Sequence, residues 1–156
     1  TMVRQFLYAT FADLYWRAMM RSGDATLAAI AAKSEKESAY HVRHSSEWIV
    51  RLGDGTEESH RRAQSAIDEL WAFTGEMFSV DDSERGLIDA GIAIDPAPLR
   101  SQWLKTITGI AGEATLALPK NDWMQQGGRS GRHSEHLGHL LSELQSMPRT
   151  FPGATW

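Results

Sequence analysis

Cysteine is absent from this sequence of 156 residues. Without thiols the chain can form no disulfide framework, zinc–thiolate site, cysteine-ligated cluster or thiol nucleophile. The absence fits a reducing compartment, where disulfides are rare.

Long apolar runs are also absent, and none approaches the ~20 residues that a membrane-spanning helix needs. We therefore expect no membrane partner. Asp13 and Arg17 interrupt the apolar start, and no small-residue cleavage site follows, so we expect that this stretch is not a signal peptide. Apolar periodicity begins at once, with no cap before Met2, so we expect a chain cut from something longer.

An excess of basic residues is missing too. The formal net charge is −4, and lysine and arginine are spread among acidic residues. This pattern disfavours a nucleic-acid partner, which would select a basic patch.

Helical periodicity dominates what is present, and apolar residues make up 42% of the chain. Gly23 is expected as a left-handed end of the first helix and Asp24 as the cap of the second. Either Thr56 or Asp54 is expected to cap the third. The pattern predicts one all-α domain over residues 1–156, a helical bundle with two short β-like runs at 92–94 and 115–118. The predicted helices cover residues 2–21, 25–52, 56–78, part of 79–90, 95–114, and a last helix that Ser134 caps and whose leucines face inward.

A polar stripe interrupts the apolar face of residues 25–52 and raises the question of a metal. Di-iron carboxylate bundles use a glutamate from one helix and a Glu-x-x-His pair from the next. Here Asp13 would replace the lone glutamate, but Ser38, not glutamate, stands three residues before His41. Glu37 stands four residues before it, and a serine hydroxyl is a poor iron ligand.

We therefore interpret Glu37 and His41 as a metal-free polar network in the core. A bound metal and a solvated helix face remain the alternatives. The Asp13–Arg17 pair is expected to form an ordinary salt bridge one turn apart.

Three stretches give the chain a family resemblance. They are the pattern ExxxHxxxSxxWxxRLGDGT that begins at Glu37, the stretch IAIDPAPLRSQW, and the ending GGRSGRHSEHLGHLLSELQ. In these the chain resembles the PaaC-type subunits of bacterial phenylacetyl-CoA 1,2-epoxidase, over nearly its whole length.

The resemblance implies a ferritin-like fold and a cytoplasmic location in bacteria. It also implies a structural role beside a PaaA-type catalytic α-subunit, which carries the di-iron site and binds the CoA thioester. Asp13, Glu37, Ser38 and His41 would then be positions of a degenerate site, and the chain would hold no cofactor. Relatives begin with two more helices, so we also expect self-association of this shorter chain.

Other candidate sites are weaker. Arg129 and Arg132 lie in a glycine-rich stretch before a helix and could bind an anion such as a CoA phosphate. The alternative is a loop that packs on the bundle or on a partner. The histidines of His133-x-x-His136-x-x-His139 face different sides of a helix, so one metal ion cannot collect all three.

Trp123 and Trp156 fall in a loop and in the tail. Both are candidates for contact with a partner chain, with core docking as the alternative.

Three functions remain open. The favoured one is a non-catalytic subunit that binds and stabilises an oxygenase α-subunit. The second is a di-metal oxidase that uses Asp13, Glu37 and His41. The third is a CoA- or anion-binding module around Arg129 and Arg132.

Overall fold

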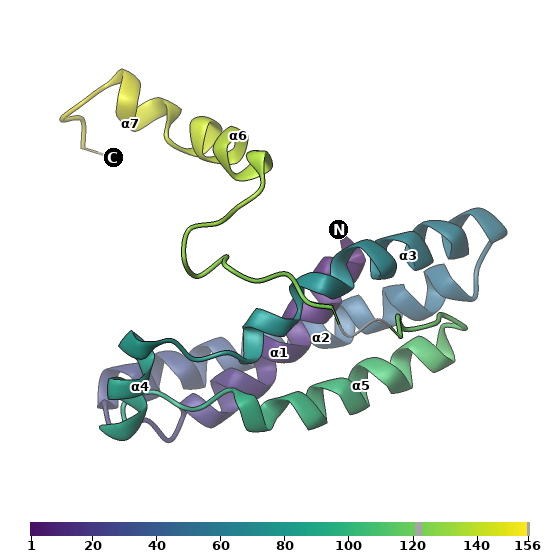
Figure 1. Cartoon of the computed structure of the whole chain (residues 1–156), viewed down its shortest axis with the longest axis horizontal. Helices are drawn as coiled ribbons and strands as arrows, with labels where there is room; N and C mark the ends of the chain where they lie inside the picture. The colour runs from purple at the N-terminus through teal and green to yellow at the C-terminus, as the bar shows by residue number, and fades with distance from the viewer. Residues whose placement is uncertain (121–122, 156) are drawn as a thin grey trace. The chain divides into compact units, whose positions relative to one another are not determined.

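The computed structural model describes residues 1–120 and 123–155. The chain forms two compact units, residues 1–124 and 125–156, and each is described by itself. All regular structure in the described ranges is helical (Figure 1), which confirms the all-α class and is consistent with a ferritin-like bundle. The single domain over 1–156 stays a prediction. The elements are α1 (Met2–Met19), α2 (Ala25–Gly53), α3 (Glu57–Leu70), the 3₁₀ turns Trp71–Phe73 and Gly75–Phe78, α4 (Asp82–Asp89), the 3₁₀ turn Ala97–Leu99, α5 (Arg100–Glu113), α6 (Glu135–Leu144) and α7 (Ser146–Thr150).

Helices α1 and α2 form an antiparallel pair joined by a short turn (Figure 1). The Asp24 carboxylate caps α2 by accepting a hydrogen bond from the Leu27 amide at 2.9 Å, as predicted. The left-handed role of Gly23 was wrong, because α1 ends in the right-handed conformation at Met20. The Gly23 amide instead donates to the Gly91 carbonyl at 2.7 Å and ties this turn to the end of α4.

Helix α3 begins after Thr56, whose hydroxyl accepts a hydrogen bond from the Ser59 amide at 3.2 Å. Of the two predicted caps, Thr56 is therefore the one used and Asp54 is not. The helix ends at Leu70 rather than near Phe78, and two 3₁₀ turns continue the chain. The predicted β-like runs at 92–94 and 115–118 form no strand in the part of the chain that is described.

The core of residues 1–124 is centred on Trp103 of α5, which is 2% exposed. Its indole Nε1 donates to the Leu7 carbonyl of α1 at 2.9 Å, so its one polar atom is satisfied. Trp71 and Phe78 pack on the same ring at centroid distances of 5.6 and 5.4 Å. Helices α3 and α5 thereby pack against the α1–α2 pair (Figure 1).

The end of α2 touches the end of α5 with almost no clearance. A Cβ atom on Gly53 would lie 2.2 Å from the Ala114 carbonyl oxygen. The Gly53 carbonyl lies 2.8 Å from His60 Nδ1 and accepts from the Thr115 hydroxyl at 3.4 Å. Only glycine allows this approach of two backbones.

In residues 125–156, α6 carries an amphipathic pattern. Ser134 precedes it as predicted, but its side chain makes no capping hydrogen bond. Of the leucines expected to face inward, Leu137 is half-buried, whereas Leu140, Leu141 and Leu144 are exposed, with Leu140 at 54% and Leu144 at 67%. This part of the prediction was wrong, because a short helix buries an apolar face only where another element covers it.

Candidate functional site

The positions predicted to form a degenerate site, Asp13, Glu37, Ser38 and His41, divide between α1 and α2. On α1, the Asp13 carboxylate is held by Arg17, with Nε–Oδ2 and Nη2–Oδ1 distances of 3.0 Å. Arg17 also reaches across to α2, where its Nη2 lies 3.3 Å from Glu35 Oε1. The predicted Asp13–Arg17 salt bridge is confirmed, and its extension to Glu35 links the two helices. The Asp13 carboxylate is therefore already bound in an ion pair with the Arg17 guanidinium.

Glu37 and His41 lie on the outer side of α2. Their side chains are 77% and 40% exposed, and the His41 Nε2 to Glu37 Oε1 distance is 3.7 Å. The interpretation of these residues as a polar network in the core was wrong, and the solvated-face alternative describes them. Successive residues in a helix turn by about 100°, so burying position 38 turns position 37 outward.

Ser38 and Ser45 take the inward positions of α2. Ser38 is 8% exposed and Ser45 is fully buried. The Ser45 hydroxyl donates to the His41 carbonyl at 2.6 Å and so satisfies itself within its own helix. The middle of the inward side of α2 thus carries small hydroxyl side chains, between buried Ala31 and Ile49.

This donor set does not fit an iron pair. Asp13 is bound to Arg17, Glu37 points outward, and Ser38 offers only a hydroxyl. Across residues 1–120 and 123–155, no three histidine, cysteine, aspartate or glutamate side chains are grouped as a metal site.

The glycine-rich stretch before α6 forms a tight turn. The Gly127 carbonyl accepts from the amides of Ser130 and Arg132 at 3.0 and 2.8 Å. Gly127 and Gly131 have φ values of 100° and 82°, which glycine adopts without strain. Arg129 and Arg132 are exposed, and the stem of Arg132 lies against Gly127. Their role as anion ligands stays a prediction.

The remaining predicted positions lie on the surface or outside the described residues. His133, His136 and His139 are exposed on or before α6. Trp123 is 60% exposed. Trp156 falls outside the described residues, and the interface role of both tryptophans stays a prediction.

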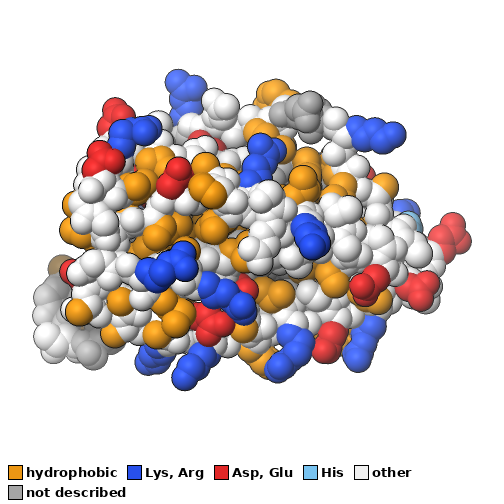
Figure 2. Space-filling model, turned by 90° about the horizontal axis from the view of Figure 1, so that it is seen from below, with side chains coloured by type: hydrophobic (Ala, Val, Ile, Leu, Met, Phe, Trp, Pro, Cys, Tyr) orange, Lys and Arg blue, Asp and Glu red, His pale blue; other side chains and the backbone are white. Residues whose placement is uncertain are grey.

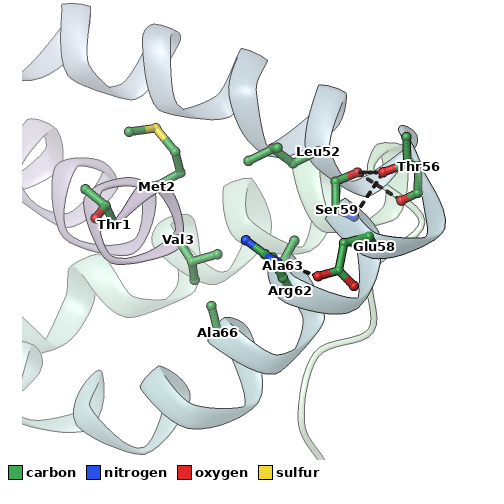
Figure 3. Close-up of a pocket in the computed structure, with 10 residues that line it drawn as sticks. All are labelled: Thr1, Met2, Val3, Leu52, Thr56, Glu58, Ser59, Arg62, Ala63 and Ala66. Carbon is green, nitrogen blue, oxygen red and sulfur yellow. Dashed lines mark hydrogen bonds and ion pairs between the residues drawn. The ribbon is translucent and has the colours of Figure 1, made fainter.

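A hollow of about 540 Å³ lies where the start of α1 meets the end of α2 and the start of α3 (Figure 3). Its floor is mainly apolar, with Val3, Leu52 and Ala63, and Arg62 and Glu58 stand at its rim. The Glu58 carboxylate accepts from Arg61 and Arg62, and these bonds lower its pKa, Arg61 most strongly. The charge of Arg62 at the rim is therefore paired with the Glu58 carboxylate.

The sequence prediction missed a row of rings on α2, formed by exposed Tyr40, half-buried His44 and exposed Trp48. Tyr40 and His44 stack with centroids 5.9 Å apart and planes inclined by 13°. His44 and Trp48 meet at 6.5 Å. Spacing of four residues, which places side chains one above another on a helix, was the available signal.

In the described residues the chain is an all-helical bundle protein whose carboxylates on α1 and α2 do not gather into a metal site. The chain belongs to the phenylacetic acid catabolic protein family, whose model matches residues 1–156. It is 41% identical over 156 residues to the C subunit of the 1,2-phenylacetyl-CoA epoxidase of Escherichia coli (strain K12). That match covers 100% of this chain and 63% of the relative's length. No helix in the described residues is both long and apolar enough to cross a membrane.

Proposed function

We propose that this chain is a structural subunit of a phenylacetyl-CoA epoxidase. In this role it binds and stabilises the di-iron catalytic subunit during aerobic phenylacetate breakdown. The observation that carries the proposal is the 41% identity to a subunit of such an epoxidase over every residue of the chain.

The geometry of α1 and α2 supports a non-catalytic role. The position where an iron-binding relative would place glutamate holds buried Ser38, and the Asp13 carboxylate is bound to Arg17. A carboxylate held by a guanidinium would have to give up strong charge-assisted bonds before it could bind a metal ion. The chain therefore contributes surface and rigidity, and the chemistry belongs to its partner.

Co-expression with the catalytic subunit tests this proposal. We expect the two polypeptides to co-purify and to elute together in size-exclusion chromatography. The catalytic subunit should also melt at a higher temperature in the complex, because a partner that binds only the folded state stabilises it. Separate elution would contradict the proposal, as would phenylacetyl-CoA epoxidation by this chain alone.

Self-association of this chain is a separate proposal from the sequence. Light scattering at micromolar concentration tests it, and a monomeric mass would overturn it. Tyr8 and Phe73, which are 53% and 60% exposed, line one hollow together with Leu7 and Met77, and this apolar surface supports self-association. Figure 2 shows that hydrophobic side chains reach the surface between charged ones.

A further inference from the structure

The chain leaves α5 through a turn that holds a threonine in the left-handed conformation. The Leu116 amide donates to the Ala111 carbonyl at 2.9 Å. The Thr115 amide donates to the Gly112 carbonyl at 3.1 Å. These two bonds are those of a Schellman motif, whose left-handed position is usually glycine. Thr115 takes that position with a φ of 57°, and it is the one non-glycine residue with a positive φ in the described ranges. A side chain branched at Cβ makes this conformation strained, so neighbouring contacts must enforce it.

Side chains of α3 supply contacts on both sides of the strained residue. The Gln64 Nε2 donates to the Ala117 carbonyl at 2.9 Å, and the Gln64 Oε1 accepts from the Ala117 amide at 2.9 Å. One turn earlier in α3, His60 Nδ1 lies 2.8 Å from the Gly53 carbonyl. The Thr115 hydroxyl donates to the same carbonyl at 3.4 Å. The turn after α5 is therefore fixed by α3 and by the end of α2.

Residues 114–117, which we define as the latch, combine opposing contributions to stability. Ala114 and Leu116 are 0% and 6% exposed, so their burial keeps the latch closed. Thr115 and Ala117 are exposed, and the strain at Thr115 favours opening. The backbone of Ala117 receives both of its hydrogen bonds from one side chain instead of from a helix. A segment held in this way can open locally while the helices around it stay folded.

We propose that the latch is a conformational device that opens as one unit and releases the end of α5 from α2 and α3. In the open state Thr115 leaves the left-handed conformation, and the amide and carbonyl of Ala117 bond to water. Gln64 is the positioning residue that keeps the latch closed. The inference goes beyond the proposed function and does not depend on it, because every contact lies within this chain.

Native-state hydrogen exchange, followed by NMR on the full chain, measures the opening. The amides of Thr115, Leu116 and Ala117 should exchange at one common opening frequency, because they are released together. That frequency should be at least about tenfold higher than for the amide of Ile107, which lies in the middle of α5 and is 1% exposed.

A pair of substitutions at position 115 separates strain from hydrogen bonding. Thr115→Gly removes the strain, and opening should become about fivefold less frequent. Thr115→Val keeps the branched side chain but loses the hydroxyl, and opening should become about threefold more frequent. Opposite changes in the two variants are therefore expected.

Substitution of Gln64 tests the contact that keeps the latch closed. Gln64→Ala removes both bonds to Ala117, and opening should become about tenfold more frequent. Gln64→Glu keeps an acceptor for the Ala117 amide and loses the donor, so its effect should be smaller. The matched control is Gln102→Ala at an exposed position of α5, which should change the opening frequency by less than about twofold. Circular dichroism confirms that each variant is folded.

Three results would overturn the latch. The first is exchange of its amides only at the frequency of Ile107, since the segment would then open only when the core unfolds. The second is unequal opening of the three amides, which would show fraying residue by residue. The third is a Thr115→Gly variant that opens as often as the wild type or more often, since strain would then not drive the opening. Each of these results leaves the proposed function standing, because no partner enters the measurement.

Discussion

Gly53→Ala tests whether the contact between α2 and α5 is as close as the structure places it. The added Cβ would lie 2.2 Å from the Ala114 carbonyl oxygen and 2.8 Å from the Ala114 Cβ. The obstacle is backbone and cannot rotate away, so the two helix ends must separate. Such overpacking costs about 1–3 kcal/mol.

Separation also strains the hydrogen bonds at the Gly53 carbonyl, where His60 Nδ1 lies at 2.8 Å. Losing one such bond adds about 1 kcal/mol, for a total of about 2–4 kcal/mol. For a chain of this size, the total corresponds to a fall in Tm of about 4–16 °C. Thermal and urea unfolding followed by circular dichroism measure both quantities.

Gly109→Ala is the control, because nothing lies within 4 Å of a Cβ at that position in α5. It should stabilise the chain by about 0.5–1 kcal/mol, since alanine loses less backbone entropy than glycine in a helix. A Gly53→Ala variant as stable as the wild type would refute the close contact. Equal destabilisation by both variants would show that the effect has another source.

Three further outcomes are expected. Trp103→Phe should lower the free energy of unfolding by about 2–3 kcal/mol, because the buried ring is smaller and the hydrogen bond to the Leu7 carbonyl is lost. Urea unfolding measures this change. A change below the error of the fit would contradict this packing. Asp24→Ala should cost about 1 kcal/mol by removing the cap of α2, with Asp24→Asn close to neutral as its control. In an NMR titration the pKa of Glu58 should lie below the ordinary glutamate value because Arg61 stabilises its carboxylate, and Arg61→Gln should raise it. Because folding lowers the pKa of Glu58, its contribution to stability is present above the ordinary glutamate pKa and is lost as the pH falls through the lowered pKa. A Glu58 that titrates like an isolated glutamate would contradict its hydrogen bonds to Arg61 and Arg62.

Local rules in the sequence predicted the helices well. Asp24 and Thr56 cap where their side chains predicted, because a cap depends only on residues within one turn. The end of α3 was predicted less well, because Trp71 and Phe78 leave the helix to pack on Trp103. That contact joins residues far apart in the chain, and periodicity alone does not encode it.

The candidate site was predicted by position but not by orientation. The sequence shows that a serine, Ser38, and not a carboxylate stands three residues before His41. The sequence does not show that Glu37 points outward, because at helical spacing either position 37 or position 38 could face inward. The link from Arg17 to Glu35 depends on how α1 and α2 lie together.

The sequence by itself determined the helical class, the Asp24 and Thr56 caps and the family resemblance, since each depends on residues close together in the chain. Tertiary structure decided which side of α2 is buried, that the rings of Tyr40 and Trp48 are exposed, and why position 53 must be glycine. Those features depend on the distance between helices, and packing sets that distance only when the whole core has formed.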